Sequence, residues 1–339
     1  MTTLDIRRID PFDDESVDAW WQAYADAERA ERGAHAAVWT LEESRHELRQ
    51  QSETIERRAH LVRRDGVVVA SARLALPRRE NTARAALGVH VPPAFRRQGI
   101  GSAVLTALEA EARVEGRTVL DGEVSWPYAL GEDGAGSPGR SFATRHGYAL
   151  ALSDVQSTLS LPVDARILDH LDAEASARSA GFRVESWNGP VPEDVVAGWA
   201  TLDASLETEA PTGDRVLEAS TAAVEDVRAS ERLLQAQRRT SFGSVAVDAD
   251  GQVVAYTQIV VSGDDGNAYQ WGTLVDRSRR GHRLGTLVKI ANLRRLQRES
   301  PATSQVITYN AGVNEHMLEI NRRLGFVPTE RMGEFQKAL

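Results

Sequence analysis

Two glycines at the junction of a predicted strand and a predicted helix constrain the fold of this chain most. Residues 83–91 are predicted to form a strand, and residues 102–114 carry apolar side chains at helical spacing. Gly99 and Gly101 lie between them. Glycine lets backbone N–H groups approach an anion closely, and a helix N-terminus adds unpaired donors and a positive dipole end. The junction is therefore predicted to bind a phosphate, with a turn that binds nothing as the alternative.

The basic residues of this junction define its pattern more closely. Arg96 and Arg97 precede the glycines, giving the order Arg96-x-x-Gly99-x-Gly101. This order differs from the Gly-x-Gly-x-x-Gly of dinucleotide-binding folds and lacks the Gly-Lys-Ser/Thr of a nucleotide P-loop. It resembles the coenzyme A pyrophosphate loop of the GNAT superfamily of N-acetyltransferases. The resemblance implies acetyl-CoA as co-substrate.

Composition narrows the class of protein. The 339 residues suggest two or three domains, and 42% hydrophobic with 26% charged residues is typical of a soluble globular chain. A formal net charge of −9 argues against general affinity for nucleic acid or anionic membranes. The absence of cysteine excludes disulfides, thiolate metal sites and a cysteine nucleophile. The charged N-terminal sequence and the lack of a long apolar run predict a cytoplasmic protein. No metal is expected.

The first half of the chain is predicted to be one domain. A Thr40-x-x-Glu43 capping box predicts a helix start, and Asp65-Gly66 predicts a hairpin. The expected strands are 4–9, 60–64, 67–76, 83–91, 117–126 and 152–161, and the expected helices are 13–31, 40–51, 102–114 and a short one ending at Gly147. This order of elements resembles that of the GNAT fold.

The second half repeats this order at an offset of roughly 180 residues, which indicates tandem domains rather than a solenoid of short repeats. Its expected strands are 182–187, 243–247, 253–261, 267–275 and 305–310, and its expected helices are 192–204, 224–239, 286–297 and 314–324. We therefore predict a mixed α/β fold of two GNAT domains, each a largely antiparallel sheet flanked by helices. The expected boundaries are 1–161 and 181–339, with a helical connector at 162–180.

The GNAT resemblance implies where the coenzyme lies. In that superfamily it lies between two parallel strands that splay apart, here 83–91 with 117–126 and 267–275 with 305–310. The implied coenzyme residues of the first domain are Val89, Val91, Arg96, Arg97, Gln98, Gly99, Ile100, Gly101 and Ser102. Those of the second are Thr273, Val275, Arg280, Gly281, His282, Arg283, Leu284, Gly285, Thr286, Asn310 and Asn314.

Both domains depart from the family pattern. Arg283 stands where the first glycine of the second loop is expected, and Gly136 stands where the first domain would match Asn314. For the asparagines, the alternative is that Asn310 and Asn314 serve only as caps or turn residues. Many GNAT enzymes use a tyrosine on the last helix as the acid for the leaving thiolate. Counting back from Gly147 and Gly325 gives Ala143 and Asn321 at that position.

Acetyl transfer to an amine also requires a base, because a primary amine is protonated at neutral pH. Glu123, which shares a strand face with Asp121, and His90 are the candidates in the first domain. Tyr309 and Glu319 are the candidates in the second. For each residue the alternative is an ordinary solvated or hydrogen-bonded side chain.

The predicted function is acetyl-CoA-dependent transfer of acetyl to a primary amine of a small molecule or peptide by direct attack. No nucleic-acid or membrane partner is expected. Two alternatives remain. The chain could be a non-catalytic acyl-CoA-binding module, as the absent tyrosines suggest, or an acyltransferase that uses another acyl-CoA.

Overall fold

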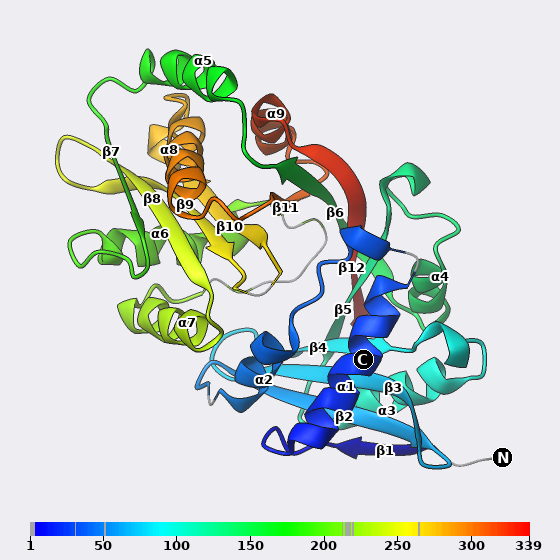
Figure 1. Ribbon diagram of the computed structural model, residues 1–339. Helices are drawn as coiled ribbons and strands as arrows, with labels where there is room; N and C mark the ends of the chain where they lie inside the picture. Colours follow the sequence, from blue (N-terminus) through cyan, green and yellow to red (C-terminus); the bar gives the residue numbers. More distant parts are fainter. Residues whose placement is uncertain are drawn as a thin grey trace. The chain divides into compact units, whose positions relative to one another are not determined.

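The computed structural model describes residues 4–30, 32–50, 52–211, 213, 218, 220–263 and 265–339. Residues 31 and 51, at the expected ends of the first two helices, lie outside the described residues. Contacts divide the chain into two compact units (Figure 1). The first unit contains Met1–Asp154, Gly213–Glu218 and Glu330–Leu339, and the second contains Val155–Thr212 and Ala219–Thr329.

The first unit is a mixed sheet with helices on both faces. Its elements in chain order are β1 (Asp5–Arg8), α1 (Asp14–Arg29), η1 (Gly33–His35), α2 (Leu41–Arg49), β2 (Ile55–Arg64), β3 (Val67–Pro77), β4 (Arg84–His90), η2 (Pro93–Phe95), α3 (Ile100–Val114), β5 (Val119–Pro127), η3 (Tyr128–Leu130) and α4 (Pro138–Arg145). The strand order is β1-β2-β3-β4-β5-β12, and only β4 and β5 pair in parallel. The fold class predicted from sequence is confirmed.

Local sequence signals explain the start of this unit. Thr40 accepts a hydrogen bond from the Glu43 amide and the Glu43 side chain returns one to the Thr40 amide, so the predicted capping box is confirmed. Asp65 and Gly66 both have positive φ, 52° and 80°, as a two-residue hairpin turn requires. The β2–β3 hairpin is therefore confirmed as well.

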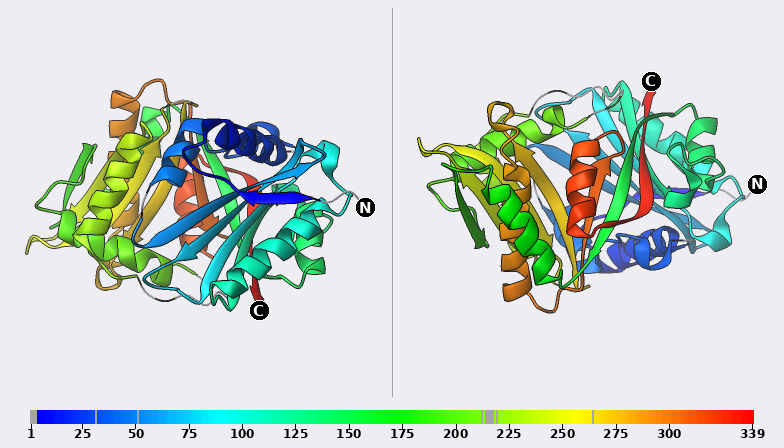
Figure 2. Two further views of the ribbon diagram at one scale, coloured as in Figure 1. Left: turned by 90° about the horizontal axis from the view of Figure 1, so that it is seen from below. Right: turned by 90° about the horizontal axis from the view of Figure 1, so that it is seen from above.

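Helices cover both faces of the first sheet. Helices α1 and α2 lie on one face and α3 lies on the other (Figure 2). The main core lies beneath α3, where Val104 and Leu108 pack on Leu74, Leu87 and Leu120. A second apolar cluster lies beneath α1 and α2, where Val17 and Trp20 pack with Ala59 and Leu61.

The second unit repeats this plan. The elements that follow along the chain are β6 (Ala149–Ser160), α5 (Ala165–Ser176), β7 (Arg183–Asn188), α6 (Val196–Glu209), α7 (Val224–Ala236), β8 (Thr240–Val247), β9 (Val253–Val261), β10 (Asn267–Val275), η4 (Arg277–Arg279), α8 (Leu284–Glu299), β11 (Gln305–Ala311), α9 (Glu315–Leu324) and β12 (Val327–Ala338). The start of β6, up to Asp154, and the part of β12 from Glu330 onward belong to the first unit. The order of strands in this unit is β6-β11-β10-β9-β8-β7, with β10 and β11 parallel. Helix α8 packs on one face, and α6 packs on the other through Trp199.

The last strand of the chain was not predicted from the sequence. Residues Glu330 to Ala338 of β12 pair antiparallel with β5, from Glu330 opposite Pro127 to Ala338 opposite Val119. Phe335 of this segment is 2% exposed and belongs to the core of the first unit. The sequence pattern assigns residues 330–339 to the C-terminal domain, whereas their contacts group them with the first unit.

Candidate functional site

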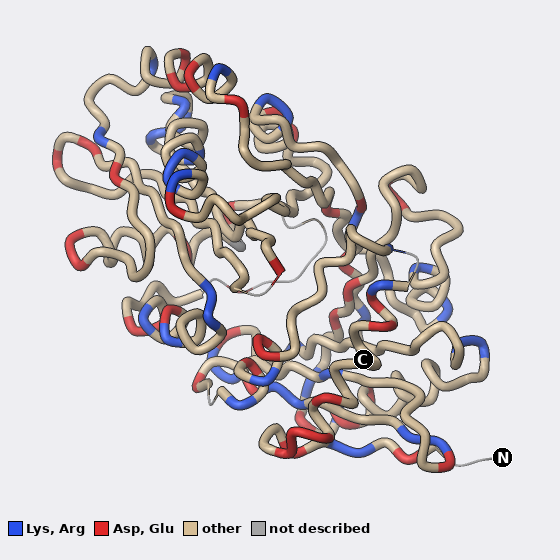
Figure 3. Tube along the Cα trace, viewed as in Figure 1, with Lys and Arg blue, Asp and Glu red and all other residues tan. Residues whose placement is uncertain are grey.

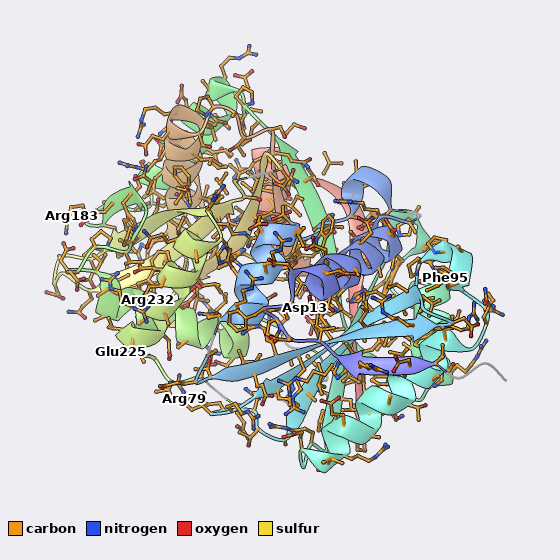
Figure 4. The ribbon with its side chains drawn as sticks, turned by 60° about the horizontal axis from the view of Figure 1, so that its bottom comes forward. Asp13, Arg79, Phe95, Arg183, Glu225 and Arg232 are labelled. Carbon is orange, nitrogen blue, oxygen red and sulfur yellow. The ribbon has the colours of Figure 1, made fainter. Side chains whose placement is uncertain are left out.

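The glycine loop of the first unit forms an N-terminal helix site. After β4 the chain makes the 3-10 turn Pro93–Phe95, where Figure 4 labels Phe95, and then enters α3. Arg97 and Gly99 have positive φ, 62° and 79°, and Gly99 is the N-cap residue of α3. Among the described residues no side chain caps this helix. The N–H groups of its first turn, from Ile100 onward, are therefore suited to an anion.

The side chains of this loop mainly hold its shape. The Arg96 guanidinium donates to the backbone oxygens of Val91 at 2.9 Å and Ala27 at 3.3 Å. The Gln98 amide donates to the Ala94 oxygen at 3.2 Å. Arg96 is therefore bound to backbone oxygens, and the backbone N–H groups of the loop are the donors suited to an anion.

Further along α3, Ile100 is buried and Ser102 lies beside α4. The Ser102 hydroxyl is 3.0 Å from Nε2 of His146. A Cβ at Gly101 would lie 3.3 Å from the Phe142 ring, so glycine permits α4 to approach α3 closely. The loop is thus closed on one side by α4.

The parallel strands β4 and β5 separate toward their C-terminal ends. They pair from Arg84 opposite Val119 to Leu87 opposite Gly122, and no later pair joins them within the described chain. Val89 and Val91 lie beyond the last pair, with side chains packed against the core. The fork between the strands therefore opens toward the glycine loop.

His90 is buried next to this fork. It is 8% exposed, its Nδ1 lies 3.2 Å from Oε1 of Glu28, and the Tyr24 ring packs edge-on at 4.9 Å. Burial raises the pKa of Glu28, but the hydrogen bond and charge of His90, with Arg32, outweigh burial and lower this pKa to about 2. Glu28 is therefore ionised at neutral pH and can accept a hydrogen bond from Nδ1 of His90. This contact fixes the orientation of the ring.

The Nε2 atom of His90 lies on the other side of the ring from Glu28. It is buried and has no hydrogen-bond partner among the described residues. A Cβ at Gly88 would lie 2.9 Å from this atom and 2.7 Å from Cγ of Arg73, so both side chains lie over the bare backbone of Gly88. A buried histidine that a carboxylate orients through one ring nitrogen is an arrangement found in general bases.

A cavity of about 290 Å³ lies on the same face of the first sheet. Its walls include Tyr24 and Arg73, which also border His90, together with Glu47, Asp121 and Glu123. Asp121 is occupied, because it accepts hydrogen bonds from Arg84 at 2.9 Å and Gln336 at 3.0 Å. Glu123 is half-exposed and only loosely paired with Arg73, at 3.9 Å. Of the two neighbouring carboxylates, Glu123 is the one open to a ligand.

The second loop keeps the backbone conformation of the first despite its different sequence. Gly281 and Arg283 have φ of 89° and 55°, and Arg283 is the N-cap residue of α8. Each loop thus has residues of positive φ at the same two positions. The first loop has arginine and then glycine there, and the second has glycine and then arginine. Leu284 and Thr286 are buried in the first turn, and a Cβ at Gly285 would lie 3.5 Å from Val275, an ordinary contact.

The polar side chains of the second loop bind other parts of the same unit. Arg280 contacts the Val275 oxygen at 3.4 Å and Glu209 at 2.7 Å. His282 Nδ1 lies 3.2 Å from the Arg178 oxygen. Arg283 lies 3.5 Å from Glu174. As in the first loop, backbone donors carry the anion-binding potential.

A β-bulge marks the fork of the second unit. Strands β10 and β11 pair from Asn267 opposite Gln305 to Gln270 opposite Thr308. The register of β10 with β9 shifts between Gln270 and Gly272, and bulges of this kind bend a strand and recur beside active sites. Beyond it, the Thr273 hydroxyl is 2.7 Å from that of Thr257.

The remaining candidates of the second unit lie in three different settings. Asn310, at the end of β11, accepts a hydrogen bond from Asn321 at 2.6 Å. Asn314 caps α9 by accepting from the Met317 amide at 3.2 Å, as the alternative for this residue expects. Glu319 is exposed and binds Arg322 at 2.7 Å, and the Arg322 hydrogen bond lowers its pKa. Tyr309 is half-buried on β11. Of these residues, only Asn310 joins a polar cluster at the fork.

Sequence reasoning missed two functional candidates. Glu28 lies on α1, 62 positions from the His90 that it binds, and no local pattern indicates that pair. Lys289 interrupts the buried run of α8, between Val288 and Ile290, and is itself 2% exposed. A lysine within the apolar face of a helix is the sequence signal that could have identified Lys289 as a functional candidate.

No helix within the described ranges is long and apolar enough to cross a membrane. Among the same residues, no group of three or more His, Cys, Asp or Glu side chains is placed to hold a metal ion.

Comparison with known proteins agrees with this geometry. Residues 17–125 match the acetyltransferase (GNAT) family. A tandem GNAT protein from the clavulanic acid biosynthesis pathway is similar over 99% of this chain and 98% of its own, at 29% identity and a TM-score of 0.78. No curated protein sequence matches the chain significantly.

Two more distant structures share the fold. A GCN5-related N-acetyltransferase from Sphaerobacter thermophilus covers 99% of this chain and 95% of its own, at 16% identity and a TM-score of 0.64. A putative acetyltransferase from Pyrococcus horikoshii covers 99% and 89%, at 14% identity and a TM-score of 0.57. Residues 17–125 therefore match an acetyltransferase domain of the GNAT family, and the whole chain is similar to a tandem GNAT protein.

Proposed function

We propose that the chain is an acetyl-CoA-dependent N-acetyltransferase that acetylates a primary amine of a small molecule or peptide. The observation that carries this proposal is the arrangement in the first unit. An uncapped helix N-terminus, a fork between parallel strands and a cavity of about 290 Å³ occur together there. Glu123 lines the cavity, and His90 lies behind the lining residues Tyr24 and Arg73. Acetyl-CoA would supply an acetyl group activated as a thioester.

The loop residues of the first unit would bind the pyrophosphate through backbone N–H groups, from Arg97 to Ser102. Val89 and Val91 would line the fork. The left-handed residues of the loop support this assignment, because they set the first turn of α3 open to an anion.

In our proposal, the amine enters the cavity and its positive charge is bound by Glu123. His90 then accepts the proton through Nε2, directly or through one water molecule. Glu28 is a positioning residue, because it fixes the ring so that Nε2 is the free acceptor. Tyr24 and Arg73 support this pathway, since each lines the cavity and also borders the histidine.

We propose that the second loop, residues 280–286, is a further coenzyme site, with Thr273, Val275 and Asn310 along its fork. The left-handed conformation of Gly281 and Arg283 supports this site despite the exchanged residues. The bulge in β10 supports it also.

Calorimetric titration of acetyl-CoA into the full chain tests both sites. We expect Gly101→Asp to remove binding at the first site and Gly285→Asp to remove it at the second, because each places a carboxylate near a bound pyrophosphate. Gly101→Ala and Gly285→Ala are the matched controls, since they add the Cβ without the charge. A wild-type chain that binds no acyl-CoA would contradict the proposal.

Release of free thiol in the presence of amines tests catalysis. Thiol release that requires an amine, and that His90→Gln lowers while acetyl-CoA binding persists, is the expected result. Binding without amine-dependent release would favour the non-catalytic acyl-CoA-binding module. Faster release from a longer acyl chain would favour a different acyl donor.

A further inference from the structure

Lys289 of α8 carries a buried ammonium group in the second unit. Its side chain is 2% exposed. Its Nζ donates to Oδ1 of Asn321 at 3.2 Å and to Oε1 of Gln270 at 3.3 Å, and it lies 5.9 Å from the centre of the Phe326 ring. Both acceptors are neutral amides, and no ion pair joins Lys289 to any carboxylate of the described residues. Since an ammonium has three donors, one N–H remains for a ligand.

This burial is energetically unfavourable. Burial lowers the pKa of Lys289 from 10.5 to about 7, because the charged form loses hydration without gaining an anionic partner. Isolated buried charges are rarely retained in proteins without a functional reason. Figure 3 shows other basic positions along α8, but Lys289 is the one that is buried to this degree within the described helix.

The first unit shows that the fold does not need this lysine. Lys289 follows Gly285 by four residues, and Leu105 follows Gly101 by the same spacing. Asn321 precedes Gly325 by four residues, and Ala143 precedes Gly147 likewise. Leu105 and Ala143 are both buried in an apolar core. The same two positions are therefore apolar in one unit and polar in the other.

The polar pair lies at the fork between β10 and β11. Gln270 is the last residue of β10 that pairs with β11, and Asn310 lies just beyond the last paired residue of β11. Asn321 connects the two sides, because its Oδ1 accepts from Lys289 and its Nδ2 donates to Asn310. Asn321 also occupies the position where the family's tyrosine acid is expected. Lys289 thus brings a proton donor to that position from a different helix.

We propose that Lys289 is the group that stabilises and protonates the coenzyme A thiolate in the second unit, with Asn321 and Gln270 as its positioning residues. This inference depends on the proposed coenzyme site of residues 280–286. When the amine nitrogen forms its bond to the acetyl carbon, the carbon–sulfur bond breaks and sulfur takes the electron pair. The Lys289 ammonium gives its proton to sulfur and becomes neutral. The proton lost by the amine restores the ammonium through solvent.

The test measures ionisation of the bound thiol rather than turnover. Coenzyme A and desulfo-coenzyme A, which lacks the thiol, are titrated into the full chain carrying Gly101→Asp, so that binding reports on the second loop. In the chain with Lys289, we expect the ultraviolet absorbance of a thiolate to appear at a lower pH for bound than for free coenzyme A. Lys289→Met is expected to abolish that shift. It should also reduce the preference for coenzyme A over desulfo-coenzyme A by roughly ten- to a hundredfold.

Two controls separate the possible failures. Desulfo-coenzyme A should bind equally with and without Lys289→Met, which shows that the fork still folds. A second outcome is that Gly285→Asp removes binding, but the bound thiol ionises at the same pH as the thiol of free coenzyme A. This result would overturn the role of Lys289 and leave the second coenzyme site intact. If Gly285→Asp removes no binding, the second coenzyme site itself is wrong and the inference fails with it.

The double variant Lys289→Leu with Asn321→Ala provides a matched comparison, because it installs the residue types of the first unit. We expect it to bind coenzyme A without a thiolate signal. A thiolate signal that persists in this variant would overturn the proposal.

Discussion

Arg32 and Glu330 form a bidentate ion pair between residues 298 positions apart in the chain, with Nη2 2.7 Å and Nε 3.0 Å from Oε2. Glu330 is 2% exposed and Arg32 12% by side chain. Arg32 also donates to Glu28, which holds His90. The C-terminal strand is thereby connected, through two charged residues, to the proposed catalytic histidine.

Removal of Glu330 tests that connection. Glu330→Ala removes one of the two carboxylates that bind the Arg32 guanidinium, and we expect a loss of about 2 kcal/mol in the free energy of unfolding. Chemical denaturation measures it. Glu319→Gln is the matched control, because its ion pair with Arg322 has the same length but is exposed, and it should leave stability unchanged. An equal effect of both variants would contradict the structural role of Glu330.

Removal of residues 330–339 tests whether the first unit needs the C-terminal strand. This truncation exposes the edge of β5 and removes Phe335 from the core. We expect the first unit to lose its cooperative unfolding transition, and residues 1–161 expressed alone to behave in the same way. Hydrogen exchange of β4 and β5 amides in the truncated chain provides the measurement. Unchanged protection of these amides would show that β12 is dispensable.

Glu28 predicts a pH dependence of stability. Its pKa falls from 4.5 to about 2 on folding, so the folded state favours the ionised carboxylate. The resulting stabilisation is present above pH 4.5 and is lost as the pH falls toward 2. Because the Glu28 side chain is partly exposed, we expect this stabilisation to be about 2 kcal/mol at neutral pH. Denaturation curves of the wild type and Glu28→Gln should differ at pH 6 and converge near pH 2, and parallel curves would contradict this prediction.

Lys289 predicts a second rise of stability with pH, in a higher range. Its pKa is lowered to about 7, so below pH 7 the folded state contains an unfavourable charge, and stability rises as the pH increases from 7 toward 10.5. Lys289→Met should therefore raise the free energy of unfolding by about 1–3 kcal/mol at pH 6. The gain should shrink as the pH approaches 10. A loss of stability at pH 6 would mean that Lys289 serves the fold rather than the proposed thiolate site.

The left-handed position of Arg283 predicts a stabilising substitution. Arg283 has φ of 55° where Gly99 has 79° in the other unit, and glycine adopts this region without steric strain. Arg283→Gly should raise the free energy of unfolding by up to about 1 kcal/mol. Gly99→Arg should lower it by a similar amount. Thermal unfolding of both variants checks the pair, and destabilisation by Arg283→Gly would show that its 3.5 Å contact with Glu174 outweighs the strain.

Much of each domain could be predicted from local sequence. The capping box at Thr40, the hairpin at Asp65-Gly66 and strand 267–275 are each encoded within a few residues, because caps, two-residue turns and alternation depend on neighbouring side chains. Strand β12 was missed because its partner β5 lies far away in sequence. Its segment contains charged residues throughout, which obscures alternation in a strand that is only half-buried.

The sequence by itself determined the two glycine loops and the resemblance to GNAT domains, since these features repeat in order along the chain. That resemblance in turn implied the parallel strands beside each loop. Only the tertiary structure decided the partners of the buried polar groups. Glu28 with His90, Arg32 with Glu330 and Lys289 with Asn321 each join residues from different elements. The physical reason is that burial and electrostatic coupling depend on distances in space, which residue spacing along a chain does not specify.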